Sequence, residues 1–353
     1  MKISSNIQLD NPSHTFVIAE AGSNWKAGDA NADLKRAKEL IHTASRCGAD
    51  AIKFQVYRAS TVYVPNAGDV DSLTKGVDRQ NIYEIFDKFS MPYEMIQELS
   101  EECVNENIIF MSTAFSVKDA EVVDKYVPIH KVASYEINHI RLLEFLAKTK
   151  KPIILSTGAS TYEEIDFAVD FLKKNGAYSI ALLQCTAVYP APFHSLNLSS
   201  IPEMKKRYGI PIGFSDHSLD PLVAPLVSLS YGATIIEKHF TLSKSFEGPD
   251  HSFALEPEEL NLMIKAIRNA EKAKGDGNKI VFKEEEELRH FATRSIQAIT
   301  DIKNGEILQE GVNFDVLRPG KRKKGIEPRF LLEVNGKKSK KDVKKGDGII
   351  DFE

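Results

Sequence analysis

The chain has 353 residues, of which 42% are hydrophobic and 27% are charged, and its formal net charge is −4. This balance suits a globular protein with one large domain and a smaller one, and it gives no reason to expect nucleic acid or a membrane surface as a partner. The three cysteines are widely spaced, the N-terminal residues lack an apolar leader, and no apolar run approaches the roughly 20 residues of a membrane helix. We therefore expect a cytoplasmic protein without disulfides.

Short apolar runs alternate with amphipathic segments over residues 1–278. The expected strands cover residues 16–19, 51–55, 108–113, 130–133, 152–157, 180–185, 212–215 and 234–237. The expected helices cover residues 33–47, 93–106, 116–125, 141–149, 161–175 and 258–274. Apolar runs without polar alternation are typical of parallel strands that are covered on both faces. Eight such units predict an α/β fold of the (β/α)8 TIM-barrel type. The alternative is a doubly wound sheet, which usually has a Gly-rich phosphate turn after its first strand, and residues 20–24 (EAGSN) are not such a turn.

The sequence changes character after the predicted barrel. Residues 279–291, which include a run of charged side chains, are predicted as a linker. Residues 292–353 are predicted as a small β-rich domain with strands at 294–298, 312–317 and 348–350. Two Lys-x-Gly-acid turns are expected to place Gly305 and Gly346 at positive φ. Within the barrel, the connection at residues 56–92 is too long for a simple turn, which is typical of a functional loop.

Two histidine motifs follow two neighbouring predicted strands. Residues 213–218 (GFSDHS) contain His217, and residues 237–241 (EKHFT) contain His239. In a barrel of this type the chemistry lies at the carboxyl ends of the strands, so both imidazoles are expected at one rim with acids beside them. Two histidines leave most of a coordination sphere open. This favours a labile divalent metal that also holds substrate oxygens and polarises a carbonyl.

Charged and hydroxyl side chains are concentrated at the other strand ends. Lys53 and Lys131 lie within or beside apolar runs, where a charge requires a partner. Together with the hydroxyl groups of Thr113, Ser134 and Ser156, they suit an anion with several oxygens, most simply a phosphate with a carboxylate nearby. The same rim carries three carboxylates that could move protons.

The order of these segments resembles the sialic acid synthase family, the phosphoenolpyruvate-dependent synthases of nine-carbon 2-keto sugar acids. The matching segments are residues 18–24 (IAEAGSN), 52–55 (IKFQ), 111–116 (MSTAFS), 130–136 (HKVASYE), 155–158 (LSTG), 184–186 (QCT), 189–190 (YP), the two histidine motifs and 248–251 (GPDH). They cover nearly the whole predicted barrel. The C-terminal module resembles the antifreeze-like (SAF, β-clip) domain of that family, with residues 317–320 (LRPG) as its signature loop.

The resemblance implies a condensation of phosphoenolpyruvate with an N-acetylated hexose, such as N-acetylmannosamine or a diacetamido-dideoxy hexose, with release of phosphate. By analogy, His217 and His239 hold Mn2+ or Mg2+. Phosphoenolpyruvate is expected to contact Lys53, Thr113, Lys131, Ser134, Ser156 and Ser215. The catalytic residues are expected to be Glu20, Glu136, Glu237 and Asp250. The sugar is expected to contact Tyr189, Gln55 and Arg318, with Arg318 supplied by a partner subunit in a domain-swapped homodimer.

Two departures from the family pattern concern the identity of the sugar. Trp25 stands where the family usually has a histidine, and Ala187 stands where sialate synthases commonly have asparagine. One alternative is a 3-deoxy-sugar-acid phosphate synthase that uses a phosphorylated aldose, which requires a second cationic cluster. The candidates for such a cluster are Arg58, Lys75, Arg79 and Lys88. The other alternative, a non-catalytic carbohydrate-binding protein, is disfavoured because the histidines, lysines and acids are all retained.

Overall fold

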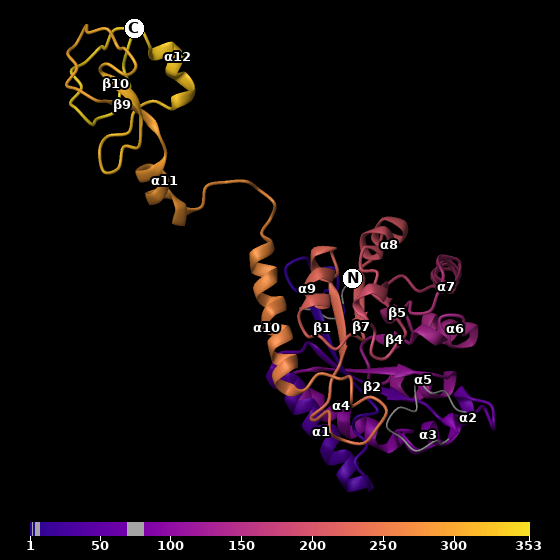
Figure 1. Cartoon of the computed structure of the whole chain (residues 1–353). Coiled ribbons are helices and arrows are strands. Elements are labelled where there is room, and N and C mark those ends of the chain that lie inside the picture. The colour runs from indigo at the N-terminus through magenta and orange to yellow at the C-terminus, as the bar shows by residue number, and fades with distance from the viewer. Residues whose placement is uncertain (2, 4–7, 69–80) are drawn as a thin grey trace. The chain divides into compact units, whose positions relative to one another are not determined.

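A computed structural model describes residues 1, 3, 8–68 and 81–353. The chain divides into two compact units, Met1–Gly275 and Asp276–Glu353. Figure 1 shows helices surrounding a central sheet in the first unit. None of the helices in the described ranges combines the length and the apolar composition needed to cross a membrane.

The first unit is a closed barrel of eight parallel strands in sequential order, as the apolar runs predicted. The strands are β1 (Phe16–Gly22), β2 (Ala51–Val56), β3 (Ile109–Ala114), β4 (His130–Val132), β5 (Ile153–Ser156), β6 (Ile180–Cys185), β7 (Ile212–Asp216) and β8 (Ile235–His239). Inside the barrel, large apolar side chains such as Phe16, Met111 and Leu183 form one core cluster. A second cluster fills the space between strands and helices. Because these clusters fill the interior, polar groups are left to the carboxyl ends of the strands.

The outer layer contains α1 (Ala30–Cys47), α4 (Tyr93–Asn105), α5 (Val117–Asp124), α6 (Ile140–Thr149), α7 (Tyr162–Lys174), α8 (Ser200–Tyr208), α9 (Val223–Ser230) and α10 (Pro257–Lys274). A capping box begins α7, with Thr161 and Glu164 bonded reciprocally. The sequence patterns did not predict α8 and α9. Helix α8 buries only Ile201 and Met204. Helix α9 has the sequence VAPLVSLS, which is too apolar to show a helical period.

Part of the connection at residues 56–92 folds into two short helices, α2 (Ala59–Val62) and α3 (Ile82–Lys88). Residues 69–80, with Lys75 and Arg79, lie outside the described residues. The aromatic ring of Tyr57 lies 4.7 Å from that of Phe86 and 5.4 Å from that of Phe115. These contacts anchor α3 beside the end of β3.

The second unit contains η3 (Lys283–Glu285), α11 (Glu286–Ala292), an antiparallel pair of β9 (Ser295–Ala298) and β10 (Phe314–Leu317), η4 (Pro328–Phe330) and α12 (Leu331–Val334). The segment predicted as a linker therefore holds most of α11. Gly305 and Gly346 have φ of 84° and 88°, as the turn pattern predicted.

The predicted strand at residues 348–350 is wrong. Gly348 forms only an isolated bridge with Gln297. A Cβ atom on Gly348 would lie 1.9 Å from the backbone nitrogen of Gly325, so two chain segments cross there at close range and the ladder does not continue.

Candidate active site

Strand register brings the predicted site residues together at the carboxyl end of the barrel. Glu20 on β1 pairs with Lys53 on β2 and with His239 on β8. Thr113 pairs with Lys131, and Ser215 pairs with Glu237. One pocket is lined by the predicted residues Glu20, Lys53, Gln55, Thr113, Lys131, Ser134, Ser156, Tyr189, Ser215, His217, Glu237 and His239.

The floor of this pocket is a buried network of lysines and carboxylates. The Lys53 ammonium pairs with Glu20, lies 3.7 Å from Glu237 Oε1 and donates a hydrogen bond of 2.9 Å to Thr113 Oγ1. Burial alone would lower the pKa of Lys53, but the two carboxylates outweigh burial and raise that pKa. Glu20 shows the opposite balance, because burial outweighs Lys53 and raises its pKa. Lys53 is therefore held as a cation.

Lys131 is the less compensated of the two lysines. Its ammonium donates to Ser156 Oγ at 2.7 Å and to the Val132 carbonyl at 3.0 Å, and its nearest carboxylate oxygen, on Glu237, is 3.9 Å away. Burial lowers the pKa of Lys131, and Glu237 offsets this only in part. A buried cation with a distant counter-charge is suited to binding an incoming anion.

Three carboxylate oxygens in this region are buried without a hydrogen-bond partner among the described residues, Glu20 Oε2, Glu136 Oε2 and Glu237 Oε2, and of these Glu20 Oε2 forms an ion pair with Lys53. Burial would raise the pKa of Glu237, but Lys131 and Lys53 outweigh it and lower that pKa, so this carboxylate stays ionised. Burial raises the pKa of Glu136 to about 7, against the opposing charge of Lys131. Glu136 can therefore exchange a proton near neutral pH.

The two histidines fit a divalent metal. His217 Nδ1 lies 2.8 Å from the Thr186 carbonyl, and this contact leaves Nε2 free as a ligand atom. His239 Nδ1 is buried and has no hydrogen-bond partner in the described part of the chain. Burial, followed by the charge of His217, lowers the pKa of His239 well below its ordinary value, which favours the neutral imidazole that binds metals. The two ring centroids are 5.4 Å apart.

Glu136 and Asp250 do not belong to the residues that line the pocket. Asp250 Oδ2 accepts hydrogen bonds from Ser23 N at 3.1 Å and Ser23 Oγ at 3.0 Å. A Cβ atom on Gly22, whose φ is 51°, would lie 2.5 Å from Asp250 Oδ2. The Asp250 carboxylate can therefore lie this close to the backbone only if residue 22 is glycine. Burial raises the pKa of Asp250.

Of the other predicted sugar contacts, Gln55 lines the pocket and Arg318 belongs to the second unit. The Gln55 amide donates to Glu20 Oε1 at 2.8 Å, so Gln55 also orients that carboxylate. Arg318 is an exposed residue of the second unit. Its place in the site of a partner subunit stays a prediction. Trp25 is fully buried in the outer core and does not line the pocket.

Sequence patterns missed several residues of the site. Cys185 is buried and also lines the pocket, with Sγ 3.9 Å from His217 Nδ1. Phe253 lies 5.0 Å from the His239 ring and 5.3 Å from the Tyr189 ring. The Tyr189 ring in turn lies 4.2 Å from that of His217. An aromatic wall of this kind comes from residues far apart in the sequence, so no local motif could reveal it.

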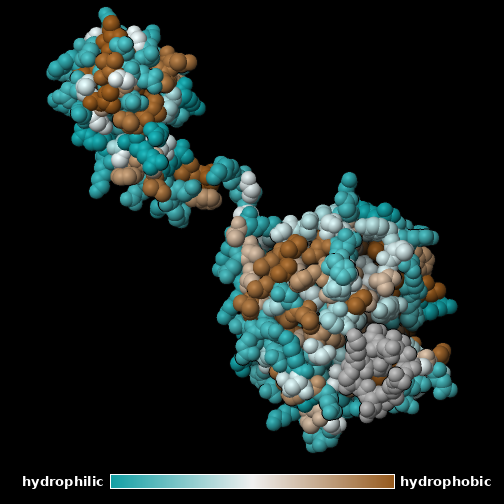
Figure 2. All heavy atoms as spheres, viewed as in Figure 1, coloured by the Kyte–Doolittle hydropathy of each residue, from teal (hydrophilic) through white to brown (hydrophobic). Residues whose placement is uncertain are grey.

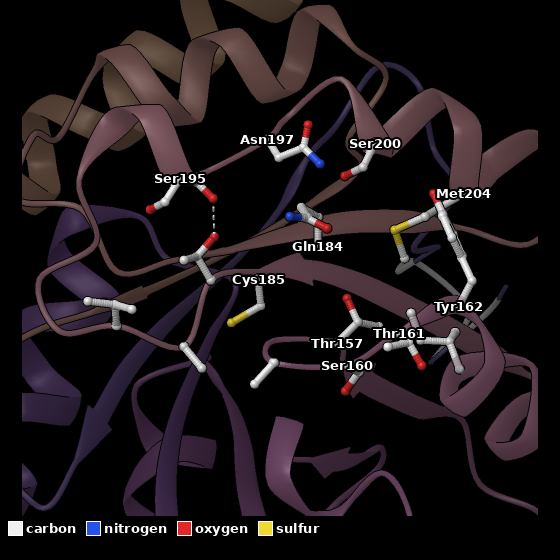
Figure 3. Close-up of a pocket in the computed structure, with 15 residues that line it drawn as sticks. Thr157, Ser160, Thr161, Tyr162, Gln184, Cys185, Ser195, Asn197, Ser200 and Met204 are labelled. Atoms are coloured by element: carbon white, nitrogen blue, oxygen red, sulfur yellow. Dashed lines mark hydrogen bonds between the residues drawn. The ribbon is translucent and has the colours of Figure 1, made fainter.

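A second pocket lies against the outer side of β6, between α7 and α8 (Figure 3). It shares Cys185 with the first pocket, and its wall includes Ala187. Its lining has hydroxyl and amide groups but no charged side chain, so it does not suit a phosphate or a metal. Several of these groups are already used, since Thr186 Oγ1 and Gln184 Nε2 donate to the backbone carbonyls of Ser195 and Leu196.

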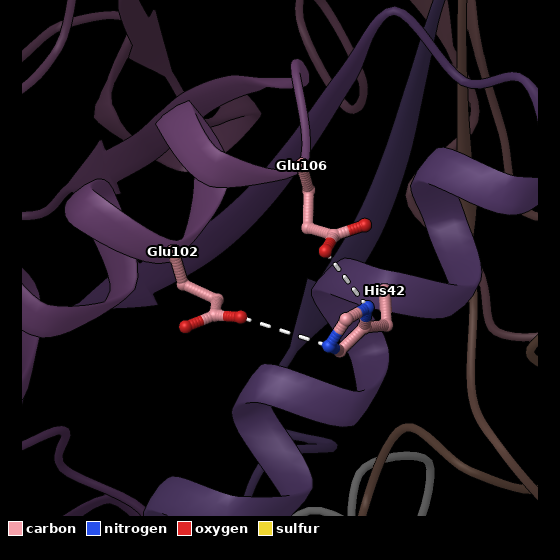
Figure 4. A group of neighbouring side chains, drawn as sticks. All are labelled: His42, Glu102 and Glu106. Carbon is pink, nitrogen blue, oxygen red and sulfur yellow. Dashed lines mark ion pairs between the residues drawn. The ribbon is translucent and has the colours of Figure 1, made fainter.

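Away from both pockets, three titratable side chains lie close together: His42 on α1, Glu102 on α4 and Glu106 directly after α4 (Figure 4). His42 Nδ1 lies 3.0 Å from Glu106, and Nε2 lies 3.6 Å from Glu102. Each carboxylate faces a different ring nitrogen, and the Lys38 ammonium lies 3.9 Å from Glu102. This arrangement is that of a surface ion-pair cluster that ties two helices together.

Comparison with known proteins defines the family. The NeuB family model matches residues 40–279. The pseudaminic acid synthase of Campylobacter jejuni is 37% identical over 337 residues, covering 95% of this chain and 95% of that protein. The N,N'-diacetyllegionaminic acid synthase of the same species is 37% identical over 339 residues, covering 95% of this chain and 98% of that protein. The chain belongs to the NeuB family.

Solved structures agree with this assignment. The spore coat polysaccharide biosynthesis protein SpsE of Bacillus subtilis superposes with a TM-score of 0.67 at 35% identity, covering 99% of this chain and 97% of that one. The N-acetylneuraminic acid synthetase of Leptospira borgpetersenii superposes with a TM-score of 0.70 at 31% identity, covering 81% of this chain and 93% of that one. A 3-deoxy-D-arabino-heptulosonate 7-phosphate synthase from Thermotoga maritima, at 17% identity and a TM-score of 0.57, shares the fold alone.

Proposed function

We propose that this protein is a nonulosonate synthase, which condenses phosphoenolpyruvate and water with an N-acetylated hexose to give a nine-carbon 2-keto sugar acid and phosphate. The observation that carries the proposal is one pocket lined both by Lys53 and Lys131 and by the imidazoles of His217 and His239. Membership in a family with relatives named pseudaminic and legionaminic acid synthases supports it.

Phosphoenolpyruvate would bind on the lysine side of the pocket. Lys53 and Lys131 supply two positive charges, and the hydroxyl groups of Thr113 and Ser156 already contact their ammonium groups. Ser134 Oγ accepts from Gly158 N at 2.9 Å and would donate its own proton to a phosphate oxygen. Ser215 would contribute another hydroxyl group. Charged donors in a water-poor pocket bind such an anion strongly.

His217 and His239 would hold Mn2+ or Mg2+. When bound, such an ion supplies Lewis acidity to the carbonyl oxygen of the open-chain sugar. The contact between His217 and the Thr186 carbonyl fixes the ring orientation that this requires. Tyr189 and Phe253 cover the imidazoles and exclude water from that side.

The remaining groups would transfer a proton, stabilise charge and bind the sugar. C3 of phosphoenolpyruvate attacks the aldehyde carbon, water adds at C2, and phosphate leaves when the C2–O bond breaks. Glu136, with a pKa raised to about 7 by burial, would take the proton of the attacking water. Glu237, kept ionised by the lysines, would stabilise the positive charge that develops at C2. Glu20, Gln55 and Asp250 would hold the sugar hydroxyl groups.

The acceptor is proposed to be a diacetamido-dideoxy hexose or N-acetylmannosamine, in line with the names of the relatives. The second unit is proposed to be an antifreeze-like SAF domain whose Arg318 reaches the site of a partner subunit in a domain-swapped homodimer. A phosphorylated aldose is less well supported, because Arg58 Nη1 already donates to the Tyr57 and Met91 carbonyls.

The test is phosphate release from phosphoenolpyruvate with Mn2+ across a panel of these sugars, with a no-sugar control. We expect release that depends on one sugar and on metal and that is lost in His217→Ala. A Lys148→Met variant, altered on the exposed face of α6, serves as the matched control. Release with a phosphorylated aldose alone would support the alternative synthase, and release without any sugar would contradict the proposal.

A further inference from the structure

A buried ion pair lies directly beside the two histidines, on the other face of the same strands. Asp216 on β7 and Lys238 on β8 are register partners. Their side chains are 0% and 1% exposed, and Lys238 Nζ lies 2.6 Å from Asp216 Oδ2. Because both side chains are buried, neither group has an exposed surface to offer a substrate.

The alternation of a strand explains why this pair flanks the metal site. Side chains of successive strand residues point to opposite faces. Ser215 and Glu237 point into the pocket, and so do His217 and His239 two residues later. Asp216 and Lys238 lie between them and point outward, so each member of the ion pair is the direct chain neighbour of a histidine.

The pair also organises the segment that follows β7. Besides Asp216, the Lys238 ammonium donates to the carbonyl of Ser218, to Ser218 Oγ at 3.3 Å and to the carbonyl of Asp220 at 3.4 Å. Asp216 Oδ1 accepts from Ser218 N at 2.8 Å. A single cation from β8 thereby binds the side chain of the residue before His217 and the backbone of the residues after it.

Fold stability alone does not account for this arrangement. Desolvation of two buried charges generally offsets their attraction, and apolar residues of similar size often replace such pairs without loss of stability. A buried pair that adds little stability can instead fix geometry.

We propose that Asp216 and Lys238 are positioning residues that set the spacing and orientation of His217 and His239 for the metal. This inference rests on the proposed function, because it assumes that the two imidazoles bind a divalent ion. Groups that orient metal ligands typically contribute about 10- to 100-fold in metal affinity.

The test compares Asp216→Leu, Lys238→Met and the double variant with wild type. Two readouts are needed: the dissociation constant of Mn2+, from electron paramagnetic resonance of the free ion, and the melting temperature of the metal-free protein. Lys244→Met is the control, since its ion pair with Glu259 on α10 is half-exposed and not next to a histidine. Asp216→Asn, which keeps the shape of the side chain, adds a milder variant in case the others fold poorly.

Each single variant should lower the melting temperature and weaken Mn2+ binding by about 10- to 100-fold. The double variant should regain most of the melting temperature but keep Mn2+ binding at least about tenfold weaker than wild type. Recovery of both properties in the double variant, or wild-type Mn2+ affinity in Asp216→Asn and in a folded single variant, would overturn the proposal. Failure of the proposed function has a different result, in which wild type itself neither binds Mn2+ nor releases phosphate.

Discussion

Replacing Lys131 with methionine should separate binding from stability. The Lys131 ammonium is buried, and its nearest carboxylate oxygen is 3.9 Å away. A hydrogen bond to a charged group contributes about 1.5–3 kcal/mol. Since about 1.4 kcal/mol corresponds to a factor of ten, Lys131→Met should weaken phosphoenolpyruvate binding by about 10- to 150-fold.

The same substitution should leave the melting temperature unchanged or raise it. Burial lowers the pKa of Lys131 in the folded protein. The folded state therefore holds the proton less tightly than the unfolded state, and the charged lysine reduces stability at every pH below its unfolded pKa. Methionine removes that charge and has a similar volume, and Lys53, 3.7 Å from Glu237 Oε1, still offsets the charge of that carboxylate.

The assay is titration calorimetry with phosphoenolpyruvate, together with differential scanning calorimetry. Lys148→Met is the control, because its i,i+4 pair with Glu144 is exposed and adds little stability. Unchanged phosphoenolpyruvate affinity in Lys131→Met would refute the anion-binding role. A large drop in melting temperature would refute the argument that this lysine is held at a cost in stability.

Further predictions concern Glu136 as the proton acceptor, the packing of the barrel strands and the core of the second unit. Burial raises the pKa of Glu136 to about 7, so kcat at saturating substrate should rise as pH increases through 7. Glu136→Gln should abolish this rise of kcat with pH. A rise that persists in the variant would assign the titration to another group. Gly213→Ala should lower the free energy of unfolding of the barrel by about 1–3 kcal/mol in denaturant unfolding. The reason is that the alanine Cβ atom would lie 2.5 Å from the Ile235 carbonyl oxygen. An unchanged free energy of unfolding would show that β7 and β8 can move apart. Phe314→Ala should cost the second unit about 3–5 kcal/mol, seen as faster hydrogen exchange at the Ile296 amide. Exchange at wild-type rates would contradict the placement of this ring in the core.

The barrel could be predicted because each strand is a short apolar run covered on both faces. Helices α8 and α9 could not be predicted in this way. Helix α8 buries too few residues to show a period, and α9 is apolar around most of its surface. Figure 2 shows hydrophobic side chains on the face of the barrel around α9, where Val223 and Val227 are exposed. Surface exposure of this kind depends on the packing of neighbouring elements, which a local pattern does not contain.

Most of the candidate site could be predicted because its residues lie at strand ends, and the fold carries all strand ends to one rim. Cys185 could not be assigned to the site from the sequence, because a thiol at a strand end has the same sequence pattern whether it faces the core or a pocket. The Asp216–Lys238 pair was visible only as part of the histidine motifs. Its pairing across β7 and β8 depends on register, which the sequence pattern does not determine.

The most direct test of the proposed function follows the atoms of phosphoenolpyruvate. The substrate carries 18O in its bridging C–O–P position and 13C in its three carbons, and the purified protein is incubated with it, Mn2+ and the sugar that supports phosphate release. We expect the released phosphate to retain the bridging 18O, and the sugar product to gain all three labelled carbons. Phosphate without the label, or a sugar that gains no carbon, would show P–O cleavage by a different type of enzyme and would contradict the account.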